Sequence, residues 1–196
     1  AGQTIAPGEA EYELGLEDQE RLLSISRATL ETYLKQGELY RVNRRDLSSS
    51  LKQPSGAFVS LYIGGRLRGC IGNFAPENAL YELVQEMTIA AAINDSRFAP
   101  VESPELPYIS IEISVLTPLQ KISSLDEFEL GRHGIYISKD GHAGTFLPQV
   151  ANGTGWSKED FLGHCSRDKA GLGWDGWKEA DLYTYEAIVF GEEKKE

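Results

Sequence analysis

The sequence predicts an α+β fold built mainly on antiparallel sheet. Strand-like and helix-like segments alternate irregularly along the 196 residues. Two glycine-containing dipeptides, Gly64-Gly65 and Asp140-Gly141, have the composition of short hairpin turns between such strands. No alternating series of strands and helices carries a glycine-rich nucleotide-binding fingerprint, which disfavours a parallel sheet. The length fits one domain, or one domain with two lobes.

Three segments are predicted to form long helices. The first is Glu17–Gln36, where leucines recur on one stripe and a glycine follows the last residue. The second is Leu80–Asn94, and Pro76 fits the first turn of a helix. The third covers 156–170, because a Ser-x-x-Asp capping pattern opens it and glycines close it. A shorter helix is expected at 125–130.

Strands are predicted where apolar residues alternate with polar ones or form short runs. The predicted strands cover residues 57–63, 66–71, 108–116, 134–138, 143–147 and 180–190. The clearest is 108–116, in which isoleucine and valine occupy every second position. Residues 38–56 have no clean period. We expect them to form a surface loop, with a cover folded over a cleft as the alternative.

The charge balance is acidic, with 30 Asp and Glu against 19 Lys and Arg and a net charge of −11. Such a chain lacks the basic footprint that duplex nucleic acid requires. No apolar run approaches the length of a membrane span. Residues 1–15 are predicted to be a flexible leader without signal-peptide features, and 191–196 a charged tail. We therefore expect a cytoplasmic protein that binds neither membranes nor duplex nucleic acid.

The two cysteines, Cys70 and Cys165, form neither a disulfide scaffold nor a metal-binding spacing. The chain also lacks the three-cysteine motif of a radical iron–sulfur enzyme, so we expect no cofactor. Cys165 falls on the apolar side of its predicted helix and is expected in the core. The only histidines are His133, His142 and His164, and the sequence places none of them beside Cys70. No catalytic triad is predicted.

The hairpin formed by 57–63 and 66–71 contains the main candidate site. With a two-residue turn, Leu61 faces Arg68 and Val59 faces Cys70, so all four side chains would share one face. A cation beside a thiol lowers the thiol pKa and increases its nucleophilicity. The alternative is a core hairpin with a packed cysteine, since unreactive buried cysteines are common.

Arg68 should not be buried without a partner, so we expect it to meet a carboxylate. Asp95 is the first choice and Glu112 the second. Gly69 and Gly72 are expected to leave their backbone N–H groups open to a ligand. Together with Arg97, these groups would form a local positive site that attracts a small anion to an otherwise acidic protein. A simple local pairing of Asp95 with Arg97 is the alternative for that turn.

The segment from Leu67 to Gly72 closely resembles the signature hexapeptide of the AMMECR-one domain family. Bacterial and archaeal members of that family are called AmmeMemoRadiSam system protein A. Six further segments match the family in order, and they are Gly56-Ala57-Phe58-Val59-Ser60-Leu61, Asp95-Ser96-Arg97-Phe98, Glu105-Leu106-Pro107, Ile113-Ser114-Val115-Leu116, Phe146-Leu147-Pro148-Gln149-Val150 and Lys169-Ala170-Gly171-Leu172. The resemblance covers about Leu16 to Phe190, which we take as one domain of two lobes.

The resemblance implies a two-lobed α+β fold with a cleft between the lobes and the signature hairpin near it. It also implies a shared modification pathway, because family members lie beside radical S-adenosylmethionine and Memo-like proteins. Two functions follow for this chain. The first is a cleft that binds a small anion or a partner through Arg68, Gly69, Gly72, Asp95 and Arg97. The alternative is a thiol-dependent enzyme with Cys70 as its catalytic residue.

Overall fold

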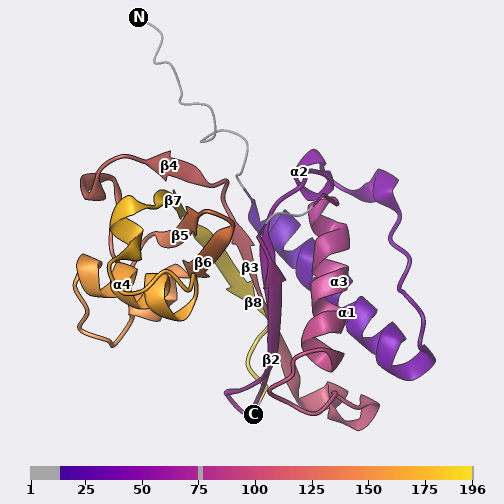
Figure 1. Ribbon diagram of the computed structural model, residues 1–196. Helices are drawn as coiled ribbons and strands as arrows, with labels where there is room; N and C mark the ends of the chain where they lie inside the picture. The colour runs from indigo at the N-terminus through magenta and orange to yellow at the C-terminus, as the bar shows by residue number, and fades with distance from the viewer. Residues whose placement is uncertain (1–13, 75–76, 196) are drawn as a thin grey trace, which may run out of the picture. The chain divides into compact units, whose positions relative to one another are not determined.

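The computed structural model describes residues 14–74 and 77–195, and Figure 1 shows the path of the chain. Pro76 and the first 13 residues of the predicted leader lie outside the described residues. The chain divides into two compact units, one formed by residues up to Leu116 together with Ile188 onward, the other by Thr117–Ala187. Each unit contains a four-stranded sheet. The predicted α+β class with antiparallel sheets and flanking helices is confirmed, whereas the cleft between lobes stays a prediction.

The first unit holds a sheet with strand order β2-β1-β3-β8. Its strands are β1 (Ala57–Ile63), β2 (Arg66–Asn73), β3 (Ile109–Leu116) and β8 (Ala187–Gly191). Strand β1 pairs antiparallel with both β2 and β3. Gly64 and Gly65 form the hairpin turn with positive φ angles of 56° and 77°, which glycine adopts at little cost.

Helices α1 (Leu16–Gln36) and α3 (Leu80–Ile93) pack together and cover one face of this sheet (Figure 1). Alternation along the strands directs Val59 and Leu61 into the core, and the apolar stripes of both helices close it. Helix α1 ends where Gly37 adopts a left-handed conformation and donates its N–H to the Tyr33 carbonyl. The other sheet face carries Phe58 and, beyond it, the polar side chains of Ser60 and Tyr62 on β1.

The pairing of β1 with β2 differs from the expected register. Ile63 faces Arg66 as predicted, but a bulge then inserts Arg68 as an extra residue on β2. Beyond the bulge, Leu61 faces Gly69 and Ser60 faces Cys70. A one-residue shift moves side chains to the opposite face. The predicted grouping of Arg68 and Cys70 with Val59 and Leu61 is therefore wrong.

The second unit contains a sheet with strand order β4-β7-β5-β6. Its strands are β4 (Gln120–Ile122), β5 (Gly134–Lys139), β6 (His142–Phe146) and β7 (Asp181–Tyr185). Helix α4 (Lys158–Asp168) packs against β5 and β6 and buries Phe161 and Leu162. The side chain of Ser157 caps this helix, together with Asp160, as the capping pattern predicted.

Strand β4 was not predicted, and the helix expected at 125–130 is only a 3-10 turn, Leu125–Glu127. Two longer segments also differ from the predicted secondary structure. The single strand expected at 180–190 is divided into β7 and β8, which belong to different sheets. The division falls at Glu186, whose N–H donates to Thr117 Oγ1 and whose carbonyl accepts from the Thr117 N–H. The expected loop 38–56 contains a 3-10 turn, Arg44–Asp46, and helix α2 (Ser49–Lys52). None of the helices in the described part of the chain is long and apolar enough to cross a membrane.

Candidate functional site

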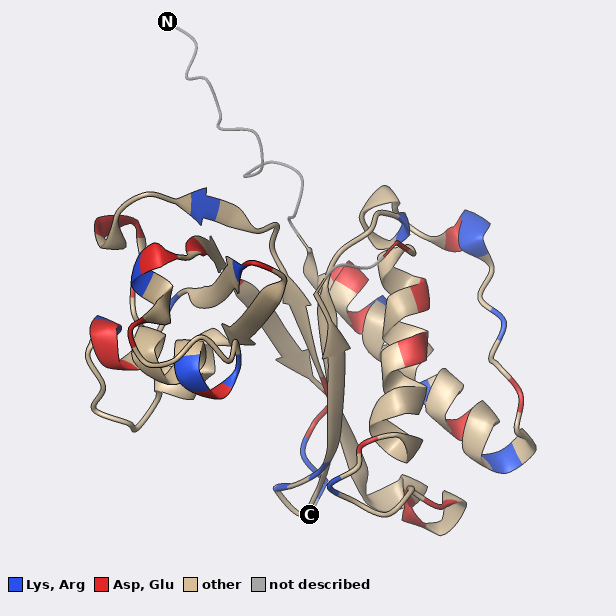
Figure 2. Cartoon of the chain, viewed as in Figure 1, with Lys and Arg blue, Asp and Glu red and all other residues tan. Residues whose placement is uncertain are grey.

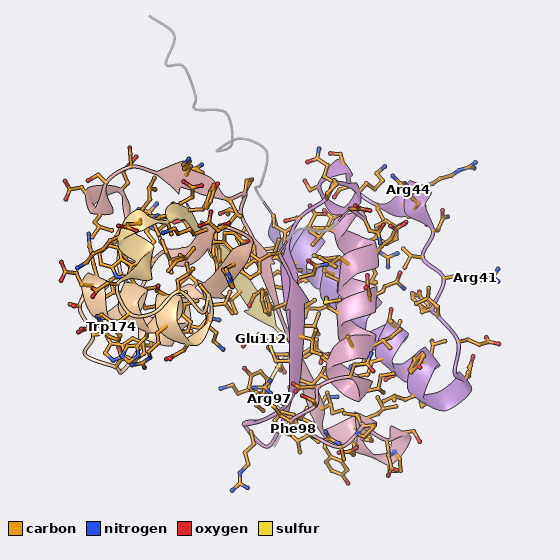
Figure 3. All side chains as sticks on the ribbon, viewed as in Figure 1. Arg41, Arg44, Arg97, Phe98, Glu112 and Trp174 are labelled. Carbon is orange, nitrogen blue, oxygen red and sulfur yellow. The ribbon has the colours of Figure 1, made fainter. Side chains whose placement is uncertain are left out.

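The sheet face opposite α1 and α3 carries a row of polar side chains. Cys70, Ser60 and Glu112 lie in register across β2, β1 and β3, so their side chains share this face. Tyr62 and Ser110 form the neighbouring row. Figure 3 shows Glu112 and Arg97 on this side of the strands, away from the helices. This polar face is the candidate site.

Cys70 is partly buried at one end of the row. The Ser60 hydroxyl donates to the Cys70 sulfur over 3.0 Å. Burial raises the pKa of the Cys70 thiol, while the Ser60 hydrogen bond and the Arg97 charge oppose that rise without cancelling it. The thiol is therefore mainly protonated at neutral pH, which is the opposite of an activated thiolate.

Asp95 is buried beside Cys70 and accepts two hydrogen bonds from the Arg97 side chain and one from the Arg97 backbone N–H. Arg97 donates from Nε at 3.0 Å and from Nη2 at 2.7 Å, and the side chain of Asp95 is only 7% exposed against 57% for Arg97. Asp95 also accepts the backbone N–H of Cys70 at 3.0 Å. The Arg97 side chain, assisted by the Cys70 N–H, lowers the pKa of Asp95 against the opposing effect of burial. The local pairing weighed from the sequence exists, and it is anchored to β2.

Arg68 contacts a carboxylate, but neither of the two we predicted. Its Nε donates to Glu105 Oε1 at 2.9 Å, and its remaining nitrogens donate to the carbonyls of Ala99 and Pro100. Burial raises the pKa of Glu105, yet the hydrogen bonds from Arg68 and from the Glu102 N–H outweigh it and leave the pKa below its ordinary value. Arg68 therefore holds the turn after α3 in place.

The space beside the Cα atoms of Gly69 and Gly72 is filled, while donation of their backbone N–H groups to a ligand stays a prediction. A Cβ added to Gly69 would lie 2.0 Å from the Ala91 carbonyl oxygen, and one on Gly72 would lie 2.2 Å from the Phe58 ring. Both glycines are needed for close approach rather than for positive φ. Their absent side chains let α3 and Phe58 pack directly on β2.

The sequence-based prediction missed three residues at this site. Ser60 becomes the neighbour of Cys70 only because of the bulge. Glu105 lies far along the chain from its partner Arg68. Tyr62 belongs to no motif that would mark it as a site residue. The histidines and Cys165 belong to the second unit, and the thiol of Cys165 is completely buried. Burial raises the Cys165 pKa to about 12. Within the described ranges, no three His, Cys, Asp or Glu side chains gather as metal ligands would.

Comparison with known proteins identifies the family. The AMMECR1 family model matches residues 23–190. A protein of Methanopyrus kandleri is 38% identical over 194 residues, and the match covers 93% of this chain and 92% of that protein. A protein of Methanosarcina mazei is 36% identical over 180 residues, and the match covers 88% of this chain and 90% of that protein. The crystal structure of an uncharacterised protein from Pyrococcus horikoshii matches with a TM-score of 0.79 and 34% identity, covering 89% of this chain and 91% of that one. The resemblance to this family is thus confirmed, and the chain belongs to the AMMECR1 domain family.

Proposed function

We propose that the polar face of the first unit is a binding site for a small carboxylate-bearing or phosphate-bearing molecule, with Arg97 as the binding group. The observation that carries this proposal is the pairing of an exposed guanidinium with a buried carboxylate. Asp95 fixes the orientation of Arg97 through Nε and Nη2, and Nη1 has no partner among the described residues. An oriented guanidinium with a free edge favours planar oxyanions.

Cys70 and Ser60 form an uncharged hydrogen-bonding surface beside the Arg97 guanidinium. The Cys70 thiol is a weak donor, and the Ser60 hydroxyl can rotate between the sulfur and a ligand. In this proposal Arg68 acts through Glu105 by positioning the turn that carries Asp95 and Arg97. Gly69 and Gly72 act by permitting the packing of β2.

We further infer that the chain acts as an AmmeMemoRadiSam system protein A, in a pathway with radical S-adenosylmethionine and Memo-like proteins. Membership of the AMMECR1 family supports this inference, since family members lie beside such proteins. The chemistry of the site supports a binding role in that pathway. Co-purification of the tagged chain with the radical and Memo-like proteins encoded beside it, in the wild type and in an Arg97→Gln variant, tests the association.

The anion proposal is tested by titration calorimetry of the full chain with phosphate, sulfate, citrate and nucleoside monophosphates. We expect at least one of these to bind and to raise the melting temperature by mass action. Arg97→Gln should weaken binding about tenfold, the loss of one charge-assisted hydrogen-bond pair. Arg45→Gln removes an equal charge from an exposed position in the 3-10 turn and is the matched control. Absence of binding, or equal binding by the Arg97 variant, would contradict the proposal.

The second candidate function is a thiol-dependent enzyme that uses Cys70. Its support is the partial exposure of this thiol and the hydroxyl donor on its sulfur. The raised pKa of Cys70 counts against it in the resting protein. A ligand that brings its own base, or displaces Asp95 from the Cys70 N–H, would be required to activate the thiol. Covalent trapping by electrophilic substrate analogues, with Cys70→Ser as the control, separates the enzyme from the binding module.

A further inference from the structure

A pocket of about 190 Å³ lies on the first unit and extends from the polar face to the end of the chain. It is lined by side chains of β1 and β3, by the hairpin turn and by the C-terminal residues. The lining residues with polar side chains are Tyr62, Ser110, Glu112, Glu192, Lys194 and Lys195. This volume is below the roughly 300–1,000 Å³ of a pocket for a drug-sized ligand. The occupant must therefore be small.

Glu112 is the group of this pocket that is best placed to bind a ligand, because its carboxylate is partly buried and unpaired among the described residues. Its side chain projects from a central strand onto the polar face and is partly buried. Among the residues the structure describes, no hydrogen-bond donor or cation pairs with its carboxylate, although a partly buried charge gains most from a partner. Burial raises the pKa of Tyr62, and the negative charge of Glu112 raises it further. The Tyr62 side chain beside the Glu112 carboxylate is therefore a neutral phenol.

The wall formed by the C-terminal residues is held in place by specific contacts. The Ser110 hydroxyl accepts the Lys195 N–H at 3.0 Å and donates to the Glu193 carbonyl at 3.4 Å. Glu192 accepts the Ile111 N–H at 2.8 Å and pairs with Arg27. The segment predicted as a charged tail thus continues along β3 up to Lys195. Lys194 and Lys195 of this segment border the pocket, and hydrogen bonds to Ser110 hold the backbone of Glu193 and Lys195 beside β3.

The pocket therefore combines one unpaired carboxylate with two ammonium groups. Figure 2 shows basic positions at the end of the chain near the turn of the β1–β2 hairpin. We propose that this pocket binds a small zwitterion of the amino-acid type. Its protonated amine would contact Glu112 and the Tyr62 hydroxyl, and its carboxylate would contact Lys194 and Lys195. A carboxylate alone would be repelled by Glu112, and an amine alone would leave the lysines without a counter-ion.

The Arg97 site lies on the same polar face but outside this pocket. Neither Arg97 nor Cys70 lines the pocket, and Ser60 lies between Cys70 and Glu112 in the strand register. The two sites can therefore fail independently. Arg97→Gln should leave zwitterion binding unchanged. Glu112→Gln should slightly strengthen binding of phosphate or citrate at Arg97, because it removes a negative charge from the same face.

The experiment is titration calorimetry of the full chain with the standard amino acids. Each amino acid that binds is compared with the acid that lacks its amine and the amine that lacks its carboxylate. Glu112→Gln, which conserves shape, should weaken amino-acid binding about tenfold or more. The double variant Lys194→Gln and Lys195→Gln should weaken amino-acid binding but not amine binding. Glu20→Gln and Lys35→Gln each remove one charge of the corresponding sign from α1 and serve as controls.

Thermal unfolding of each variant verifies that it remains folded, and Glu112→Gln should unfold like the wild type because its carboxylate has no partner to lose. The proposal is overturned if no amino acid binds, or if Glu112→Gln binds amino acids as tightly as the wild type. Equal amino-acid binding by the double lysine variant would overturn the assignment of the carboxylate end. Equal binding of an amino acid and its amine-free counterpart would overturn the assignment of the amine end.

Discussion

The carboxylate of Asp95 accepts the backbone N–H of Cys70 over 3.0 Å, although 25 residues separate them in the chain. Cys70 lies on β2, the strand at one end of the sheet order, where backbone N–H groups can lack a ladder partner. Asp95 supplies that partner from the turn after α3 and binds Arg97 with the same carboxylate. The buried side chain of Asp95 thus connects strand β2, the turn after α3 and the exposed guanidinium of Arg97.

Replacing Asp95 with alanine is expected to lower the free energy of unfolding by about 1–3 kcal/mol, because the Cys70 N–H loses its acceptor. Urea denaturation measures the change. Asp46→Ala removes an exposed carboxylate of the same unit and should stay within about 0.5 kcal/mol of the wild type. A similar effect of the two substitutions would show that the hydrogen bond to β2 adds no stability.

The pH dependence of stability should also report on Asp95. The pKa of Asp95 is lowered in the folded state, chiefly by Arg97, whereas an aspartate in the unfolded chain has a pKa of about 3.9. The folded protein therefore binds fewer protons, so this contribution is fully present above about pH 4 and is lost as the pH falls below it. Denaturation between acid and neutral pH should show a shallower acid loss for Asp95→Asn than for the wild type. Parallel curves would contradict the assignment.

The two cysteines should differ in their reaction with a thiol reagent. Cys70 is partly exposed with a raised pKa, so it should react slowly at neutral pH and faster as the pH increases. Cys165 is buried, which raises its pKa to about 12, and it should react only on unfolding. Ser60→Ala removes the hydrogen bond that lowers the Cys70 pKa, so labelling should become slower still. Mass spectrometry of the labelled peptides distinguishes the sites, and faster labelling of Cys165 would contradict the structure.

Arg68→Ala should destabilise the protein by about 1–3 kcal/mol, because Glu105 and two loop carbonyls lose a largely buried donor. A double-mutant cycle with Glu105→Gln measures the pairwise part. The neighbouring Arg66 is exposed and has no partner in the described part of the chain, so Arg66→Ala is the matched control. Additive effects of the Arg68 and Glu105 substitutions would indicate that the ion pair is not coupled.

Gly69→Ala is expected to cost about 1–3 kcal/mol or more, because the new methyl group would overlap the backbone carbonyl of Ala91 on α3. Backbone cannot move aside as a flexible side chain does. Gly15→Ala places a methyl group in open space at the start of α1 and should be nearly neutral. Thermal or chemical unfolding compares the two, and a neutral Gly69→Ala would refute the close approach of β2 to α3.

Local sequence patterns were sufficient for the main elements. The predicted helix Glu17–Gln36 corresponds to α1, and the predicted segment Leu80–Asn94 corresponds to α3. Both follow from a period of 3.6 residues, and β3 follows from a period of two. The Gly64-Gly65 turn was also correct, because the dipeptide itself sets the backbone angles. The family, likewise, was recognisable from the residues of one hairpin.

Where several segments meet, local patterns were insufficient. The bulge at Arg68 arises in the pairing of β2 with β1, and Gly69 there lies directly against the Ala91 carbonyl. Neither contact is encoded in the spacing of the hairpin residues. Glu105 was missed as the partner of Arg68 for the same reason, since α3 and a turn intervene between them. Similarly, the break at Glu186 depends on hydrogen bonds to Thr117.

The sequence by itself determined the α+β class, the helices and hairpins, the candidate residues Cys70, Asp95 and Arg97, and the acidic charge. These properties depend on each residue and its near neighbours. Only the tertiary structure decided which face Cys70 occupies, which carboxylate holds Arg68, and that Glu112 borders a pocket closed by the last residues of the chain. The physical reason is that a side chain's face depends on strand register, and register is set by contacts between segments distant in sequence.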